Sequence, residues 1–288
     1  MAGGPSPSAL LRSTPALAAA LCLVWALTFV VQRVGLAESG PLWFAAARVA
    51  VAAALLAPLL LLAPRLDSRG LRIAALLALL HMVLFVSLQV GGLATVGAGP
   101  AAAIVYTQPL LVLVFARVAL AEPLTRRRVA GALLGFAGVA VVSGRELSLG
   151  SRAGALLLLA AALAWALGTV VTKAAPEQPA LSLVVWQHLL GAPVMLAMAA
   201  LAEPLPELSG TLVATALFAG ALGSALAWFL FTVLLGRGDA GIVSTWLFSV
   251  PVLGAAFGVA LLGEPLGISL VVGIGLVAAG VRLAAERR

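Results

Sequence analysis

The chain has 288 residues, of which 63% are hydrophobic and only 9% are charged. Soluble domains contain about 25% charged and 45–50% apolar residues, so this inventory cannot cover a water-facing surface and excludes a soluble globular protein. The net charge of +7 comes from short basic clusters between long uncharged stretches, which argues against a nucleic-acid-binding face and indicates a membrane protein.

Ten membrane spans are predicted along the chain, because a helix of about 20 mostly apolar residues crosses the hydrocarbon layer. Residues 1–14 are rich in Gly, Pro and Ser and are expected to be disordered. The first four spans come from Ser13–Gln32, Gly40–Pro64 and Ile73–Ala116, the last of which is expected to break at Gly91-Gly92 and at Gly97–Pro100. The other six are Val129–Gly144, Ala153–Thr172, Gln178–Ala202, Leu208–Gly236, Ala240–Gly263 and Pro265–Val281. The fold class is therefore an all-α polytopic membrane protein.

Basic residues are distributed unevenly between the two sides of this arrangement. Thirteen lie on the side of the two termini, three on the other side (Arg33, Arg145 and Arg152), and Arg48 lies within a span. Cytoplasmic loops carry an excess of Lys and Arg, so both termini are expected in the cytoplasm, with the protein in the plasma or inner membrane.

The second half of the chain repeats the first. An offset of 140 residues aligns Trp25 with Trp165 and Arg48 with His188, and an offset of 142 aligns Pro109 with Pro251. The larger offset also aligns Ala121-Glu122-Pro123-Leu124 with Gly263-Glu264-Pro265-Leu266, and Gly131 and Gly138 with Gly273 and Gly280. We expect two units, residues 15–145 and 152–285, with five spans each. Because five is odd, the second unit enters the membrane inverted, as in many transporters.

Several segments in this order and spacing carry a family resemblance. They are Phe44–Arg48, Gly99–Pro109 leading to Glu122–Thr125, Gly223–Phe231, Arg237–Pro251 and Gly263–Leu266. In them the chain resembles the EamA-type members of the drug/metabolite transporter superfamily, from Ala16 to about Leu283. The resemblance implies a carrier of small metabolites, amino-acid or drug-like, often an exporter. Together with the inverted repeat it predicts alternating access around a midplane cavity.

Arg48 is the one charged residue inside a predicted span, about 10 Å below the surface at 1.5 Å per residue from Pro41. A charge at that depth is costly and marks function by default. Two roles are open: direct contact with substrate, or bracing of the fold through carbonyl groups at helix ends. His188, its repeat equivalent, and His81 could carry protons or simply fill helix interfaces. No Asp or Glu lies mid-span, so facilitated diffusion and histidine-linked proton exchange both remain open.

Aromatic and amide side chains provide further candidates for a cavity wall. Trp25 and Trp165 lie near mid-depth, where they either line a cavity or fill space between helices. Trp43 and Trp228, near span ends, are expected to be interface anchors. The candidate substrate-binding residues are Trp25, Arg48, His81, Gln89, Tyr106, Trp165, His188, Trp246 and Phe248.

A Glu-Pro pair ends a span in each unit, 13 residues after a proline. Such a carboxylate can accept from free N–H groups at the start of the next helix, so a structural role is favoured over ion coupling. The candidate structural motif is Pro109, Glu122, Pro123, Pro251, Glu264 and Pro265.

Other classes of protein fit less well. Gly236–Asp239 matches the Gly-x-Gly-Asp pattern of membrane aspartyl proteases, but the only other aspartate, Asp67, lies in a loop. No filter-like segment indicates a channel. A non-transporting helper or sensor subunit is the main alternative, and an intramembrane enzyme is a weaker one. With one cysteine and two histidines, neither a metal nor a cofactor is expected. The expected partners are a small-molecule substrate and the lipid bilayer, without nucleic acid, and a homo-oligomer is compatible with the sequence.

Overall fold

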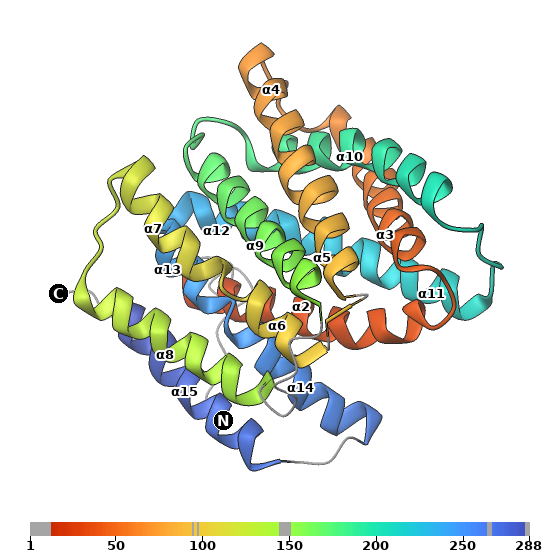
Figure 1. The fold of residues 1–288 in the computed structure, drawn as a ribbon. Helices are drawn as coiled ribbons and strands as arrows, with labels where there is room; N and C mark the ends of the chain where they lie inside the picture. The colour runs from red at the N-terminus through yellow and green to blue at the C-terminus, as the bar shows by residue number, and fades with distance from the viewer. Residues whose placement is uncertain (1–12, 94, 97, 144–150, 264–266, 286–288) are drawn as a thin grey trace, which may run out of the picture.

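The computed structural model describes residues 13–93, 95–96, 98–143, 151–263 and 267–285. All regular structure in these ranges is helical, and no strand occurs among them, which confirms the all-α prediction (Figure 1). Most of the segment expected to be disordered, together with Glu264 and Pro265, lies outside the described residues, although Thr14 already belongs to the first described helix.

The helices of the first repeat are α2 (Thr14–Leu36), α3 (Pro41–Leu56) with the 3-10 turn η1 (Ala57–Leu61), α4 (Ser68–Leu77), the π-helical segment η2 (Ala78–Leu84), α5 (Phe85–Leu93), α6 (Ala98–Val105), α7 (Gln108–Leu120) and α8 (Arg126–Ser143). Those of the second repeat are α9 (Arg152–Lys173), α10 (Ala180–Ala202), α11 (Gly210–Phe218), the π-helical segment η3 (Ala219–Leu226), α12 (Ala227–Arg237), α13 (Ala240–Trp246), α14 (Ser249–Leu262) and α15 (Ile268–Ala285).

Polar side chains cap several of these helices where the sequence changes from loop to apolar run. Asp67 accepts from the N–H of Gly70 at 2.7 Å at the start of α4, and Ser209 accepts from the N–H of Leu212 at 3.0 Å at the start of α11. Each cap satisfies a backbone donor that the first helical turn leaves free. The caps therefore contribute to fixing where the spans begin.

Nine stretches of the described chain are long and apolar enough to cross a membrane. The predicted span that is not among these nine is the fifth, Val129–Gly144, which corresponds to α8, an 18-residue helix that begins with three arginines. The predicted break at Gly91-Gly92 is displaced, because both glycines lie inside α5 and α6 begins at Ala98. The ten-helix arrangement of two inverted five-helix repeats is otherwise as the sequence predicts.

Matching irregularities occur at equivalent places in the two repeats. One span of each repeat contains a π-helical segment, η2 or η3. One span of each is interrupted just before a proline, α6–α7 before Pro109 and α13–α14 before Pro251. Each interrupted span ends in a left-handed residue, Ala121 with φ 55° and Gly263 with φ 69°. These features support the duplication read from the sequence.

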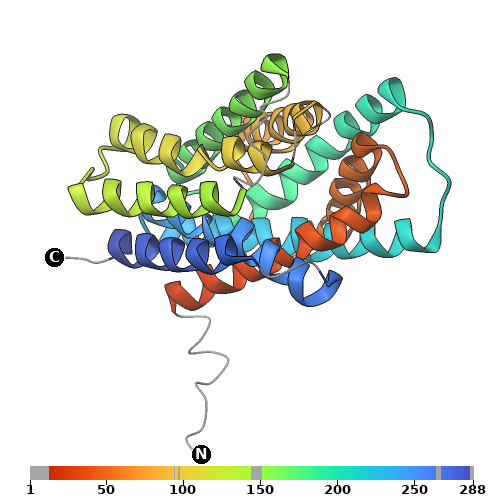
Figure 2. The ribbon, with the colours of Figure 1, turned by 60° about the horizontal axis from the view of Figure 1, so that its bottom comes forward.

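The two repeats pack against each other along several helix pairs. Helices α8 and α15 lie side by side in both views (Figures 1 and 2). Their backbones nearly touch, because a Cβ added at Gly131 would lie 2.6 Å from Gly280 O and one at Gly138 would lie 2.9 Å from Gly273 O. Helix α5, from the third span of the first repeat, packs on α9, the first span of the second repeat. In the reciprocal contact, α2, the first span of the first repeat, packs on α11 and α12, from the third span of the second repeat. The interface between repeats is thus extensive, and it surrounds the centre of the bundle.

Candidate functional site

A cavity in two parts lies between the helices. The outer chamber has a volume of about 660 Å³ and the inner chamber about 70 Å³. Helices α2, α3, α5 and α6 of the first repeat contribute to both. The residues that line both chambers are Phe29, Gln32, Arg48, Val86, Gln89, Val105 and Tyr106, so the two parts adjoin one another.

Aromatic rings form the wall of the inner chamber. Trp25 and Trp165 both line it, and their ring centroids lie 5.5 Å apart in an edge-to-face arrangement. Trp228 lies 5.0 Å from Trp165 and 6.0 Å from Trp25. Of the two roles left open for the tryptophan pair, the geometry places both residues in a cavity wall, where they also pack against each other.

The indole N–H of Trp25 has a backbone partner. Trp25 Nε1 donates to the carbonyl oxygen of Gly223 at 3.0 Å. Gly223 lies in η3, where the backbone widens from the α-helical to the π-helical pattern. The hydrogen bond therefore ties α2 of the first repeat to the π-helical segment of the second.

Arg48 lies in the wall shared by the two chambers, although it comes from the middle of an apolar helix. Its Nη1 donates to Gln32 Oε1 at 2.9 Å, and its Nε is buried without a hydrogen-bond partner among the described residues. The partner is thus a side-chain amide of α2 and not the helix-end carbonyl groups that the bracing role requires. Arg48 thus lines both chambers, and its direct contact with a solute stays a prediction.

His81 and Gln89 come from one continuous span, α4–η2–α5. His81 belongs to η2, lines the inner chamber and lies with its ring 4.4 Å from Trp228 and 5.4 Å from Trp165. Gln89 lies two turns further along and lines both chambers. The π-helical turn changes the register between them, so both side chains reach the same cavity.

Tyr106 and Gln108 lie at the interruption between α6 and α7. The backbone breaks there because Pro109, in the first turn of α7, has no N–H to continue the ladder of hydrogen bonds. Both residues line the inner chamber, and Oε1 of Gln108 is buried without a partner in the described part of the chain. The break thus presents a phenol and an amide to the cavity.

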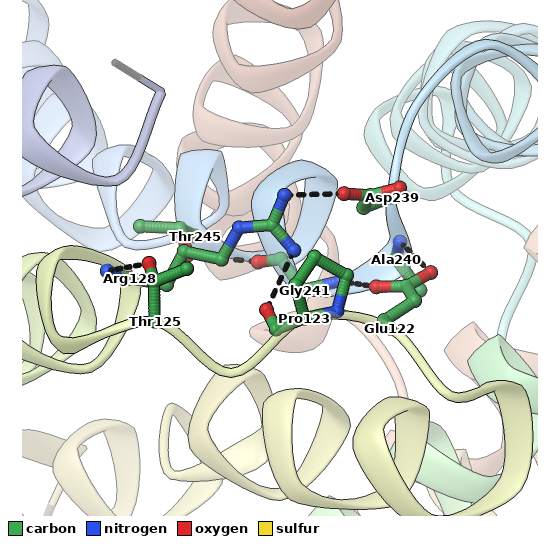
Figure 3. Close-up of polar contacts among 8 residues, drawn as sticks. All are labelled: Glu122, Pro123, Thr125, Arg128, Asp239, Ala240, Gly241 and Thr245. Atoms are coloured by element: carbon green, nitrogen blue, oxygen red, sulfur yellow. Dashed lines mark hydrogen bonds and ion pairs between the residues drawn. The ribbon is translucent and has the colours of Figure 1, made fainter. Parts of the chain in front are cut away.

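Glu122 joins the two repeats at the end of the bundle that α7 reaches. Its Oε1 accepts from the N–H of Ala240 at 2.7 Å, and its Oε2 accepts from the N–H of Gly241 at 3.2 Å (Figure 3). Next to it, Arg128 forms an ion pair with Asp239 and donates to Pro123 O at 2.8 Å. We call this group the α13 cap; its members are Glu122, Pro123, Arg128, Asp239, Ala240 and Gly241. The carboxylate caps α13 of the other repeat, and not the next helix, α8, as the sequence suggested.

Comparison with known proteins decides the family. The EamA-like transporter family matches residues 13–144 and 152–285, nearly all of the chain. The protein belongs to this family. Like the family as a whole, it is a membrane transporter of the drug/metabolite transporter superfamily, as the resemblance predicted.

Relatives of this EamA-like transporter carry transporter names. The "Uncharacterized transporter YvbV" of Bacillus subtilis is 34% identical over 281 residues, which cover 94% of this chain and 90% of that protein. The "Probable amino-acid metabolite efflux pump" of Salmonella typhimurium is 29% identical and covers 92% of each. A solved crystal structure superimposes with a TM-score of 0.82 at 20% identity, covering 97% of both chains, and shares the fold. These names point to a transporter and away from an enzyme.

Three candidates of this EamA-like transporter do not line the cavity. His188 is fully buried, and its Nδ1 lies 2.8 Å from the carbonyl oxygen of Val184 in its own helix. Phe248 is fully buried over Gly135 of α8. Trp246 is partly buried against a hydrophobic cluster that includes Cys22, and its carbonyl oxygen accepts from Cys22 Sγ at 3.3 Å. Arg48 and Tyr106, the first-repeat counterparts of His188 and Phe248, do line the cavity, whereas Trp25 and Trp165 line it from both repeats.

Several residues that line the cavity were not predicted from the sequence. Trp228 was predicted to be an interface anchor, and this is wrong, because it is 3% exposed and lines the inner chamber. Phe29 and Gln32 follow Trp25 at i+4 and i+7, and helical spacing of this kind places all three on one face of α2. That periodicity could have found them. Other unpredicted lining residues are Met82, Phe85, Val86, Val105, Leu247 and Val250.

Proposed function

We propose that the protein is a carrier that exports small metabolites, amino-acid or drug-like, by alternating access around the two-chambered cavity. The observation that carries the proposal is the position of the cavity between inverted repeats, with Trp25 and Trp165 from equivalent positions in its wall. Two halves of related sequence and opposite orientation can exchange conformations, and that exchange opens the site to alternate sides.

The two ends of the bundle differ in a way that supports this mechanism. The outer chamber extends to the exposed residues Leu36, Pro41 and Leu93 at the ends of their helices. The opposite end of the α6–α7 span is followed by Glu122, whose cap on α13 joins the two repeats. The described conformation therefore fits one state of a carrier, accessible from one end and held together at the other.

The proposed orientation rests on the distribution of the basic residues in the sequence. With both termini in the cytoplasm of an inner or plasma membrane, the outer chamber faces away from the cytoplasm and the α13 cap lies on the cytoplasmic side. An exporter would release its solute from this state. The name of the Salmonella relative, an efflux pump, supports the outward direction.

Flux measured in proteoliposomes tests the proposal. The assay would load a panel of amino acids, aromatic cations and organic acids, and we expect saturable, stereoselective flux and trans-stimulation by unlabelled solute for at least one class. Flux that rises without limit and ignores solute shape would overturn alternating access. Absence of flux for every solute under every gradient would favour the helper or sensor role.

A further inference from the structure

The charge of the cavity restricts what it can hold. Among the described residues, Arg48 is the only ionised side chain in the lining of either chamber, and no Asp or Glu lines them. Charges interact strongly where water is excluded, so a cationic solute would meet an unopposed like charge. A solute with one negative charge would instead neutralise the site.

Hydrogen-bond donors without partners gather in the inner chamber. Nε of Arg48 and Nε1 of Trp165 are both buried and unpaired among the described residues, and both side chains line that chamber. Trp165 is 5% exposed, whereas the indole N–H of its repeat equivalent, Trp25, is already bonded to Gly223 O. A buried donor left unpaired costs free energy, which the oxygen atoms of a bound anion would offset.

Gln108 is compatible with the same ligand. Its Oε1 is buried and unpaired among the described residues, and its side chain lines the inner chamber. The oxygen and nitrogen of an amide exchange places when the group rotates by half a turn. After that rotation Gln108 presents an N–H donor to the chamber. The side chain can therefore donate a hydrogen bond to an anionic group without any change in the backbone.

The sizes of the two chambers indicate which part of a solute each chamber can hold. At about 70 Å³ the inner chamber is less than half of the roughly 150 Å³ that hold a benzene ring in an engineered cavity, so it accommodates a small head group and no ring. The outer chamber, at about 660 Å³, has room for a larger body against Phe29, Phe44 and Val90. Arg48 lines both and lies where head and body would meet.

We infer that the transported solute is an organic monocarboxylate with an apolar body, bound with its carboxylate toward Arg48 and Trp165 and its body in the outer chamber. This inference rests on the proposed carrier function and narrows its substrate class. A single guanidinium balances one negative charge, so a phosphate dianion would remain half unpaired. The same reasoning disfavours amines and quaternary ammonium solutes.

Three solutes that share one body test the head group. They are 3-phenylpropanoate, 3-phenylpropanamide and 3-phenylpropylamine, measured for binding to the purified full-length protein by calorimetry and for flux in proteoliposomes. We expect the acid to bind at least about tenfold more tightly than the amide or the amine, because a hydrogen bond to a charged group is worth at least that factor. Inorganic phosphate should not compete with the acid.

The outcomes separate this inference from the carrier proposal. Equal binding and flux of all three solutes, or a preference for the amine, would overturn the carboxylate site while leaving a carrier intact. Selective binding of the acid without any flux would support the site and count against transport.

Variants locate the selectivity in the cavity. Arg48→Gln should weaken binding of the acid at least about tenfold and leave the amide unchanged, and Trp165→Phe should weaken the acid several-fold. Arg152→Gln, which removes an exposed arginine outside both chambers, is the matched control and should change neither. Loss of acid selectivity in Arg152→Gln, or its retention in Arg48→Gln, would refute the assignment.

A second variant covers the case in which Arg48→Gln does not fold. Gln32→Glu places a carboxylate on the side chain that already accepts from Arg48 Nη1 at 2.9 Å, and it leaves the arginine in place. The internal carboxylate should compete with the acid for the guanidinium and erase its advantage over the amide. Undiminished acid selectivity in well-folded Gln32→Glu would contradict the inference.

Discussion

Trp25 and Trp165 occupy equivalent positions in the two repeats and meet edge to face, with ring centroids 5.5 Å apart, yet within the described part of the chain only Trp25 has a partner for its indole N–H. The contact between equivalent residues reflects the pseudo-symmetry of the fold. The difference in hydrogen bonding shows that the surroundings of the two equivalent indole groups differ.

The capping carboxylate of Glu122 should contribute strongly to stability. Glu122→Ala removes two charge-assisted hydrogen bonds to the first N–H groups of α13, and we expect a loss of about 2–3 kcal/mol in the free energy of unfolding. Denaturant titration of the protein in detergent measures it. The control is Glu177→Ala, whose exposed ion pair with Arg69 at 3.1 Å should contribute less than about 1 kcal/mol. Equal losses in the two variants would show that the cap is unimportant.

The α8–α15 contact should tolerate no side chain at its glycines. Gly280→Ala would place a Cβ 2.5 Å from Gly131 O and 2.6 Å from Gly135 N, so the helices must separate, at a cost of about 1–3 kcal/mol. Gly275→Ala, on the same helix, meets nothing within 4 Å and should be neutral or stabilise by about 1 kcal/mol. Thermal unfolding of the two variants compares them. Similar midpoints would mean that α8 and α15 do not pack as described.

The left-handed residues predict opposite effects for reciprocal substitutions. Ala121 has φ 55°, a conformation that strains a residue with a Cβ, so Ala121→Gly should stabilise the protein by about 0.5–1 kcal/mol. Gly263 has φ 69°, and Gly263→Ala should destabilise it by about 1 kcal/mol. Unfolding midpoints test both. Two shifts of the same sign would be inconsistent with these backbone angles.

The membrane orientation predicts the behaviour of reporter fusions. An enzyme that is active only outside the cytoplasm should be active when fused after Gly150 and inactive when fused after Arg288, because thirteen basic residues lie on the side of the termini and three on the other. Comparable expression of both fusions is the control. Activity after Arg288, or none after Gly150, would invert the proposed topology.

Much of the fold could be predicted because it depends on properties that a sequence displays directly. The lengths of the apolar stretches predicted the membrane spans, and the offset of 140 residues between Trp25 and Trp165 predicted the internal repeat. The role of Trp228 was mistaken although its span was predicted nearly correctly, because distance from the span end does not show whether a side chain faces lipid or the cavity.

The composition of the cavity was harder to predict, for a physical reason. The repeat identifies Arg48 and His188 as equivalent but does not indicate which of them faces the cavity, because their surroundings depend on packing between distant helices. In the structure Arg48 lines both chambers and His188 is buried against its own helix. Sequence periodicity identifies the apolar or polar face of one helix, as for Gln32 beside Trp25, but not which helices leave a cavity between them.

The π-helical segments η2 and η3 constrain the length of the protein. Each inserts an extra residue into a span, and removal of one residue from a helix turns everything after it by about 100°. Loss of the extra residue of η2 would return that segment to α-helical geometry and keep the register beyond it. Deletion of one residue between Phe85 and Gln89, in the regular helix α5, would also leave an apolar span long enough to cross the membrane, but it would rotate Gln89 out of the cavity wall. Hydropathy would therefore tolerate such a deletion at a place where the binding cavity does not.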